Sequence, residues 1–191
     1  MKAGPGKVRI LGGSLRGSVL RVADTPDLRP TPARVRETLF NWLQPVLAGA
    51  RCLDLFAGTG ALGIEALSRG ADEVVFVERG RTAARSLEAN LQRLGCRGFR
   101  VHNVAAGDFL NGPPLPFDVV FLDPPFAAGL WSAVAQRLEQ GGWLGDHAWV
   151  HVESPRSIEP RLPANWQVHR QAHAGEVRHV LYRRDKAVRL D

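Results

Sequence analysis

Apolar positions follow two different periods along this chain. From residue 51 onward, short apolar runs typical of β-strands alternate with longer stretches whose apolar residues repeat at helical spacing. This alternation predicts an α/β fold, with a mostly parallel sheet and helices on both of its faces. The predicted strands are residues 52–56, 73–78, 99–104, 117–122 and 149–153, and the predicted helices are residues 61–70, 80–95 and about 127–139.

Two further strands are predicted near the C-terminus, at residues 166–172 and 176–184. A short turn separates them, so we expect an antiparallel hairpin that makes the sheet mixed and seven-stranded. Loops at the carboxyl ends of the strands in such a sheet are expected to form the functional site.

The N-terminal region has a pattern of its own. Residues 7–22 hold two β-like runs around Gly-Gly-Ser-Leu-Arg-Gly, which predicts a hairpin with arginines at its turn and edges. Residues 33–43 carry apolar side chains on one helical face, so we expect an amphipathic helix that begins near Thr31 or Pro32. The apolar positions are Val35, Leu39, Trp42 and Leu43. We expect Trp42 and Phe40 to pack in the core.

Positive charge is concentrated in the N-terminal region. The formal net charge is +6, and residues 1–50 contain eight Lys or Arg against three Asp or Glu, whereas the other 141 residues contain seventeen against sixteen. A basic segment on a near-neutral domain indicates a polyanionic partner, usually nucleic acid, although a solvated tail or a general bias toward arginine is the alternative. We therefore expect a basic N-terminal extension for a polyanionic partner (1–45), an α/β core (46–185) and a tail (186–191).

Several classes of protein do not fit this composition. The apolar runs are far too short to span a membrane, and the first ten residues lack the apolar segment of a secretory signal. Cys52 and Cys96 do not make a disulfide framework, so we expect a cytoplasmic, reduced protein. We expect no metal site, because CxxC motifs are lacking and His169, His173 and His179 fall on predicted strand and turn.

Residues 54–63, DLFAGTGALG, contain a formal match to G-x-G-x-x-G, the fingerprint of dinucleotide binding. Gly58 and Gly60 allow a tight turn and a close approach to a ligand, and the helix that follows points its N-terminus at that ligand. Asp54 stands just before the turn, where a carboxylate would repel a pyrophosphate. S-adenosylmethionine carries an ammonium group and a sulfonium but no phosphate, so it fits this position better than NAD.

Two further acids follow the next two strands. Glu78 ends the second predicted strand, where a carboxylate accepts hydrogen bonds from the hydroxyls of a ribose. NAD and S-adenosylmethionine share that ribose. Asp108 follows the third strand and can accept a hydrogen bond from an adenine amino group, with Phe109 nearby for stacking. Each acid alone is compatible with a solvated loop, but three acids after three successive strands indicate one nucleoside site.

Residues 121–126 read FLDPPF, at the end of a strand expected beside the one that precedes the glycine loop. Pro124 and Pro125 remove two backbone donors and have a fixed φ, so their carbonyls are left unpaired by any ladder and can face a substrate. Phe126 offers a flat face on which an extruded base can stack. The alternative is a rigid strand-to-helix turn with Asp123 as its cap.

This motif suits an exocyclic amine of a nucleobase. The lone pair of such an amine is delocalised into the ring, and an acceptor bonded to its N–H releases the lone pair for attack on a methyl group. Asp123 and the Pro124 carbonyl are such acceptors, and positioning supplies most of the remaining catalysis. A carboxylate favours guanine, which presents N1–H and N2–H side by side, over adenine, whose N1 is an acceptor.

Together, DLFAGTG, the acid at the second strand end, GD after the third strand and DPPF resemble the class I S-adenosylmethionine-dependent amino-methyltransferases. RILGGSLRG, followed by LRPTPARVRETLFNWL, resembles the RsmD family, which methylates N2 of guanine 966 in 16S rRNA. The resemblance runs from about Val8 to Tyr182. It implies a Rossmann-like methyltransferase fold, S-adenosyl-L-methionine as cofactor, and 16S rRNA in the assembled or assembling small ribosomal subunit as partner.

The resemblance also implies a role for particular residues. The implied cofactor-binding residues are Asp54, Phe56, Gly58, Thr59, Gly60, Glu78, Asp108 and Phe109. The implied catalytic residues are Asp123, Pro124, Pro125 and Phe126. The candidates for contacts with rRNA phosphates are Arg9, Arg16, Arg29, Arg34 and Arg36. We expect two or three of these arginines to contact RNA and the others to cap or shield the helix at 33–43.

Three other functions stay open at the level of sequence. DNA adenine methyltransferases use similar D-P-P-aromatic motifs, so DPPF alone does not choose guanine N2 over adenine N6. However, the roughly fifty residues before the first core strand are too few for a separate DNA target-recognition domain. An NAD(P)-dependent oxidoreductase would explain GTGALG but neither Asp54 nor DPPF. A non-catalytic assembly factor with a vestigial pocket would not need an intact DPPF. For the methyltransferase we expect a monomer.

Overall fold

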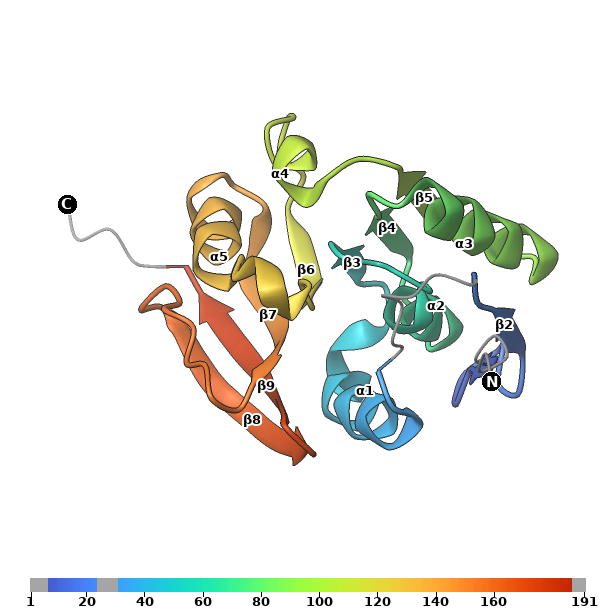
Figure 1. Ribbon diagram of the computed structural model, residues 1–191, viewed down its shortest axis with the longest axis horizontal. Coiled ribbons are helices and arrows are strands. Elements are labelled where there is room, and N and C mark those ends of the chain that lie inside the picture. Colours follow the sequence, from blue (N-terminus) through green and yellow to red (C-terminus); the bar gives the residue numbers. More distant parts are fainter. Residues whose placement is uncertain (1–6, 24–30, 187–191) are drawn as a thin grey trace.

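A seven-stranded sheet forms the centre of the computed structural model, which describes residues 7–23 and 31–186 (Figure 1). The strand order is β5-β4-β3-β6-β7-β9-β8. β3 to β7 run parallel to their neighbours in this order, and β9 pairs antiparallel with both β7 and β8. The strands are β3 (Arg51–Asp54), β4 (Glu73–Val77), β5 (Phe99–His102), β6 (Phe117–Leu122), β7 (Leu144–Pro155), β8 (Trp166–Ala174) and β9 (Val177–Asp185). The predicted mixed sheet with a closing hairpin is therefore confirmed.

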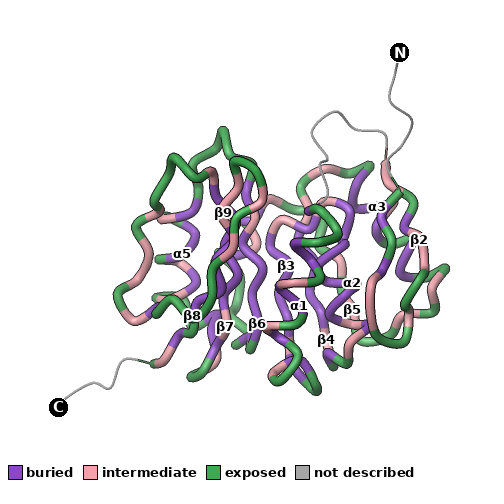
Figure 2. Tube along the Cα trace, turned by 90° about the horizontal axis from the view of Figure 1, so that it is seen from below, coloured by how far each residue is buried: buried purple, intermediate pink, exposed green. Residues whose placement is uncertain are grey.

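Helices cover both faces of the sheet, and each face has its own apolar core. Successive side chains of a strand point to opposite faces, so Phe121 of β6 joins one core and Val120 joins the other. Figure 2 shows that the central strands are buried along much of their length. The first face is covered by α1 (Ala33–Leu47), α2 (Ala61–Ser68) and α3 (Arg81–Arg93), and the second by α4 (Ala106–Phe109) and α5 (Trp131–Gln140).

The N-terminal hairpin packs on the first face and is continuous with its core. β1 (Lys7–Arg9) pairs antiparallel with β2 (Val19–Arg21), which confirms the predicted hairpin. Val8, Ile10 and Leu20 are buried in the same apolar cluster as α1, α2 and the sheet. The proposed boundary between residues 45 and 46 stays a prediction, but no break in packing marks it.

The structure corrects several details of the sequence prediction. The strand expected at residues 149–153 is the middle of the longer β7. The helix expected at about 127–139 begins as a short 3-10 turn, η1 (Phe126–Ala128), and α5 starts only at Trp131. Trp42 is half-buried at the margin of the core, whereas Phe40 is fully buried as expected. Of the predicted tail, residues 187–191 lie outside the described residues.

Within the described part of the chain, no helix is both long enough and apolar enough to cross a membrane.

Candidate active site

Three neighbouring parallel strands bring three carboxylates to one edge of the sheet. Asp54 is the register partner of Phe121, and Phe121 is the register partner of His151. Asp123 lies two residues beyond Phe121, and Glu153 lies two residues beyond His151. Because side chains alternate along a strand, these carboxylates project from the same face of the sheet as Asp54. We call Asp54, Asp123 and Glu153 the carboxylate row.

The members of the carboxylate row differ in their tendency to ionise. Burial raises the pKa of Asp54 to about 7, against a hydrogen bond from the Gly63 amide, and the negative charges of Glu78 and Glu153 raise it further. Burial also raises the pKa of Asp123 well above its ordinary value, and the charges of Glu153 and Asp54 add to this effect. A cation bound beside these two acids would restore their charged forms. The row therefore favours a positively charged ligand.

Glu153 behaves in the opposite way to its neighbours. Burial by itself would raise its pKa, but the neighbouring imidazoles of His179 and His151 and a hydrogen bond from Thr31 hold the pKa below its ordinary value. The Thr31 hydroxyl donates to Glu153 Oε1 at 3.0 Å, and His179 Nδ1 lies 3.3 Å from the same oxygen. Glu153 is thus the member of the row that the protein itself holds as an anion.

The glycine loop leads from β3 into α2 as predicted. Asp54 is 3% exposed, and its Oδ2 accepts the Gly63 amide proton at 3.0 Å. Thr59 Oγ1 accepts the Ala61 amide proton at 3.3 Å, so this hydroxyl caps the start of α2. Gly58 and Gly60 have φ values of +52° and +75°, which favour glycine. The hydrogen bonds of Asp54 and Thr59 therefore fix the junction between the loop and α2.

Two glycines of the fingerprint are required by packing within the protein. A Cβ at Gly63 would overlap the ring of Phe76, and a Cβ at Gly60 would overlap the side chain of Leu87. Close packing of α2 against β4 therefore accounts for Gly63 without any phosphate group nearby. The match to G-x-G-x-x-G carries correspondingly little information about the ligand.

Glu78 lies beside the glycine loop at the end of β4. Its Oε2 accepts the Gly58 amide proton at 2.8 Å, and its Oε1 accepts the Gly80 amide proton at 2.6 Å. An ionised carboxylate has about four lone-pair sites, so each oxygen can accept one further hydrogen bond. Asn103 donates to the main-chain carbonyl of Glu78 at 2.8 Å and thereby ties this strand end to the segment after β5. Glu78 is thus oriented toward the loop.

Asp108 and Phe109 lie together on α4, after β5. They line a cavity of about 350 Å³ with residues that include Val75, His102 and Trp143. Asp108 is exposed, whereas the Phe109 ring packs against the rings of His102 and Trp143, with centroid separations of 5.1 and 5.0 Å. The expected stacking role of Phe109 stays a prediction, because its ring already has two aromatic neighbours.

Phe56 is half-buried and packs against the apolar core of the second face. Its expected cofactor contact also stays a prediction.

The DPPF residues form a rigid turn out of β6. Asp123 is half-buried and Pro124 is buried, whereas the Phe126 side chain is 38% exposed and its ring lies 5.9 Å from that of Trp131. One sequence expectation needs correction: the Pro125 carbonyl is not left unpaired, because it accepts the Ala128 amide proton at 2.9 Å in the 3-10 turn. The acceptors that remain for a substrate are Asp123 and the Pro124 carbonyl.

Sequence reasoning missed Glu153. Its position at the end of the apolar run WVHVE repeats that of Glu78 at the end of EVVFVE, and this repetition is the signal that could have identified it. Trp131 Nε1 donates to the Glu153 carbonyl at 2.6 Å, so the same strand end also anchors the helix that follows the DPPF turn. The site therefore contains a third carboxylate and not only the predicted Asp54 and Asp123.

Arg36 is the clearest correction among the predicted RNA contacts. Its side chain is 3% exposed and lies 3.6 Å from Glu65 Oε2, which is fully buried on α2. It also donates to the carbonyls of Thr31 and Arg9, at 3.2 and 2.9 Å. A side chain sealed in this way cannot reach a phosphate. Its role is to hold the hairpin and α1 onto α2.

The other predicted RNA contacts are compatible with the structure or lie outside it. Arg9, Arg16 and Arg34 are exposed, and Arg9 donates to the Gly17 carbonyl at 2.9 Å across the hairpin. Arg29 lies outside the described residues. Contacts between these arginines and RNA stay predictions.

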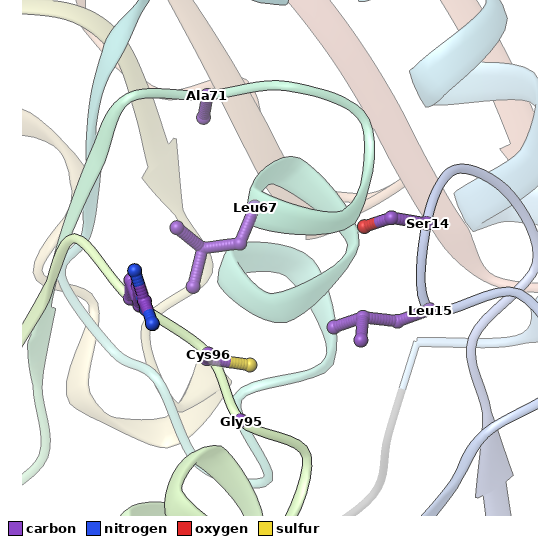
Figure 3. A pocket seen from close by; sticks show the side chains of 7 residues that line it. Ser14, Leu15, Leu67, Ala71, Gly95 and Cys96 are labelled. Atoms are coloured by element: carbon purple, nitrogen blue, oxygen red, sulfur yellow. The ribbon is translucent and has the colours of Figure 1, made fainter.

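A second cavity, of about 260 Å³, lies far from the carboxylate row along the strands. It is bounded by Ser14 and Leu15 from the hairpin, Leu67 from α2, and Ala71 and Cys96 from the segments that lead into β4 and β5 (Figure 3). These segments enter the amino ends of the strands, whereas the carboxylate row is at the carboxyl ends. This cavity is therefore not part of the candidate active site.

Comparison with known proteins agrees with this geometry. The family model described as "Conserved hypothetical protein 95" matches residues 8–183. The chain is 48% identical over 186 residues to "Ribosomal RNA small subunit methyltransferase D" of Escherichia coli K12, covering 96% of this chain and 93% of that protein. It is 44% identical to the protein of the same name from Haemophilus influenzae, covering 93% and 94% of the two chains.

Solved structures give the same picture. A putative methyltransferase from Escherichia coli superposes with a TM-score of 0.88 and 46% identity, covering 94% of this chain and 99% of that one. An RNA methyltransferase from Salinibacter ruber, solved with S-adenosyl-L-homocysteine, has a TM-score of 0.64 at 14% identity over 85% of this chain and 98% of that one. The latter likeness shows the shared fold.

Proposed function

The chain belongs to the RsmD family, and on that premise we propose that it methylates the exocyclic N2 of a guanine in 16S rRNA, at the position equivalent to guanine 966. The observation that carries the proposal is the carboxylate row: Asp54 leads into the glycine loop, and Asp123 begins the turn that carries the exposed Phe126. We further propose that the substrate is the small ribosomal subunit or its assembly intermediate, encountered in the cytoplasm by a monomeric enzyme.

The cofactor of this family is S-adenosyl-L-methionine, and the residues present fit it. Asp54 and Asp123 are acids whose ionisation a cation would favour, as the ammonium and sulfonium groups require. Each Glu78 oxygen, already bonded to one backbone amide, can accept a ribose hydroxyl. When bound, the cofactor supplies an electrophilic methyl group. A pyrophosphate in the same place would face buried acids, which argues against the NAD(P)-dependent alternative.

The DPPF turn then prepares the base. Asp123 and the Pro124 carbonyl accept the two N–H groups of the guanine amine, which draws the nitrogen toward tetrahedral geometry and frees its lone pair. The amine nitrogen would take the methyl group that the cofactor supplies, and the proton that the amine then loses would pass to the Asp123 carboxylate. The exposed Phe126 ring stacks on the extruded base. Arg9, Arg16 and Arg34 bind phosphates of the RNA outside the site.

The test uses radiolabelled S-adenosylmethionine and three substrates: small subunits from cells that lack this methylation, naked 16S rRNA, and adenine-rich duplex DNA. After digestion to nucleosides, we expect label in N2-methylguanosine from the subunits, and we expect Asp123→Ala to abolish it while S-adenosylhomocysteine still binds. Label in N6-methyladenine would replace the proposed substrate with adenine. Cofactor binding without label from any substrate would favour the non-catalytic assembly factor.

A further inference from the structure

We propose that Glu153 selects the base, by accepting the N1–H of guanine while Asp123 holds the neighbouring N2 amine. This inference rests on the proposed function and adds a specificity-determining residue to it. The DPPF motif alone does not distinguish guanine from adenine, because both bases present an exocyclic amine. A second acceptor beside Asp123 supplies the distinction, since only guanine carries a donor next to its amine.

The register of β6 and β7 puts the two carboxylates side by side. Leu122 is paired with Val152, so Asp123 and Glu153 occupy the next register position on parallel neighbours. Neighbouring strands lie about 4.8 Å apart, a separation that suits two adjacent donors on one base edge. The negative charge of Glu153 raises the pKa of Asp123 beyond the effect of burial, as expected for adjacent carboxylates.

Glu153 is held by one of its oxygens. Oε1 accepts the Thr31 hydroxyl at 3.0 Å and lies 3.3 Å from His179 Nδ1. Among the described residues, Oε2 has no hydrogen-bond donor. The side chain is only 6% exposed, so water competes weakly for it. A carboxylate with one oxygen fixed and the other available is preorganised to accept one donor from a ligand.

Two buried histidines lie next to this carboxylate. His179 of β9 stands opposite Glu153 of β7 in the pairing of these strands. His151 lies on β7, two residues before Glu153. The two imidazole rings are parallel, with centroids 5.9 Å apart, and both are buried. Within the described residues, no ring nitrogen of this pair has a hydrogen-bond partner. Burial lowers the pKa of His151 to about 4, so this ring carries no charge near neutral pH. His179 is the ring closer to the acid, with Nδ1 3.3 Å from Glu153 Oε1.

The same three residues raise the question of a metal ion. The candidate ligand atoms of His151, Glu153 and His179 lie within 4.8 Å of one another. Tetrahedral zinc would bring such atoms to about 3.3 Å from each other, given zinc–nitrogen bonds near 2.0–2.1 Å. The 3.3 Å between His179 Nδ1 and Glu153 Oε1 matches that value, whereas the Thr31 hydroxyl already donates a hydrogen bond to the same oxygen. The bond from Thr31 favours a hydrogen-bonded carboxylate, and the experiment includes a metal ion as an outcome.

The decisive substrate is 2-aminopurine, which keeps the amine of guanine but has an acceptor at N1. We would place it at the target position of 16S rRNA, assemble small subunits from that RNA, and compare kcat/KM with the guanine-containing subunits. The wild-type enzyme is expected to prefer guanine by about 100-fold or more, because 2-aminopurine sets a lone pair against the Glu153 carboxylate. A wild-type preference below about threefold would overturn the proposal without any variant.

Glu153→Gln is the matching variant, because an amide both donates and accepts hydrogen bonds. We expect the ratio of kcat/KM for guanine over 2-aminopurine to fall by about tenfold or more, with S-adenosylhomocysteine affinity unchanged. Glu73→Gln is the control: Glu73 pairs with Arg51 and Arg100 at the start of β4, far from the row. A merely structural role for Glu153 would lower both rates together and leave the ratio unchanged, which would contradict the proposal.

Two further results separate the possibilities. Absence of N2-methylguanosine with the wild-type enzyme would refute the proposed function itself, whereas methylation with an unchanged ratio in Glu153→Gln would refute only the role of Glu153. Zinc present at one ion per chain by mass spectrometry, and lost in His151→Phe, would identify Glu153 as a metal ligand and overturn the proposal.

Discussion

Arg36 of α1 and Glu65 of α2 form an ion pair of 3.6 Å in which both side chains are buried. The Glu65 carboxylate also accepts the backbone amide protons of Leu11 and Gly12, both at 2.8 Å, and pairs with Arg69 at 2.8 Å. One buried carboxylate thus joins the hairpin, α1 and α2. A charge this deeply buried is tolerable because each of its oxygens has a partner.

Arg36→Met is therefore expected to destabilise the protein. Loss of the guanidinium leaves Glu65 buried with one cation fewer, which costs about 3 kcal/mol of unfolding free energy. Urea denaturation followed by circular dichroism measures this. Arg34→Met is the matched control, since Arg34 is exposed on the same helix: stability should change by less than about 0.5 kcal/mol, while RNA affinity falls. Equal stability of the two variants, with RNA binding lost in Arg36→Met, would restore Arg36 as a phosphate contact.

Cofactor affinity is expected to depend on pH through Asp54. The pKa of this acid is raised to about 7 in the free protein, chiefly by burial, and a bound cation favours its ionised form. Affinity should therefore rise as pH increases toward 7 and level off above it, with about tenfold weaker binding at pH 6 than at pH 8. Calorimetry with S-adenosylhomocysteine, which keeps the ammonium group, measures this.

Asp54→Asn provides the check on that assignment. The amide still accepts the Gly63 amide proton but does not titrate, so binding should be weaker and nearly independent of pH. A pH dependence that survives in Asp54→Asn would assign the titration to another group of the carboxylate row.

Gly63→Ala is expected to destabilise the fold, because the added Cβ would overlap the Phe76 ring. Overpacking of this kind costs about 1–3 kcal/mol, and a thermal melt should show it. Gly107→Ala is a control within another helix, where the nearest atom to the new Cβ is a flexible end of Arg137 at 3.4 Å. Phe76→Leu should partly rescue Gly63→Ala. No loss of stability in Gly63→Ala would mean that ligand contact, not packing, requires this glycine.

Phe126→Ala is expected to lower kcat/KM for the RNA substrate by about 5–100-fold, the range of a single base–aromatic stack. The ring is 38% exposed, so stability and S-adenosylhomocysteine affinity should hardly change. Leu130→Ala, at a neighbouring apolar side chain that is 36% exposed, is the control and should retain activity. A similar activity loss in both variants would point to a disturbed turn rather than to stacking.

The spacing of apolar residues predicted the sheet well, because the apolar residues of each strand and helix recur at the spacing typical of that element. The sequence also predicted that Asp54, Glu78 and Asp123 stand at the carboxyl ends of strands, as the structure has them, while their roles stay predictions. It could not identify Glu153, whose relation to Asp123 depends on the pairing of β6 with β7 across residues far apart in the chain. Nor could the sequence predict that Arg36 is buried while Arg34 is exposed. Both are arginines on the same helix, and the burial of Arg36 against Glu65 depends on the tertiary packing of α1 on α2.

The common core of the hairpin and the sheet affects how the protein would select a nucleotide in the RNA. Val8, Ile10 and Leu20 are buried together with residues of α1, α2 and β6, so the hairpin cannot swing against the strands that carry Asp123. An RNA strand bound by the exposed arginines of this region would be held at a set distance from Asp123. The target nucleotide would then be selected by its distance from the RNA segment that the arginines bind, and not only by the identity of its base.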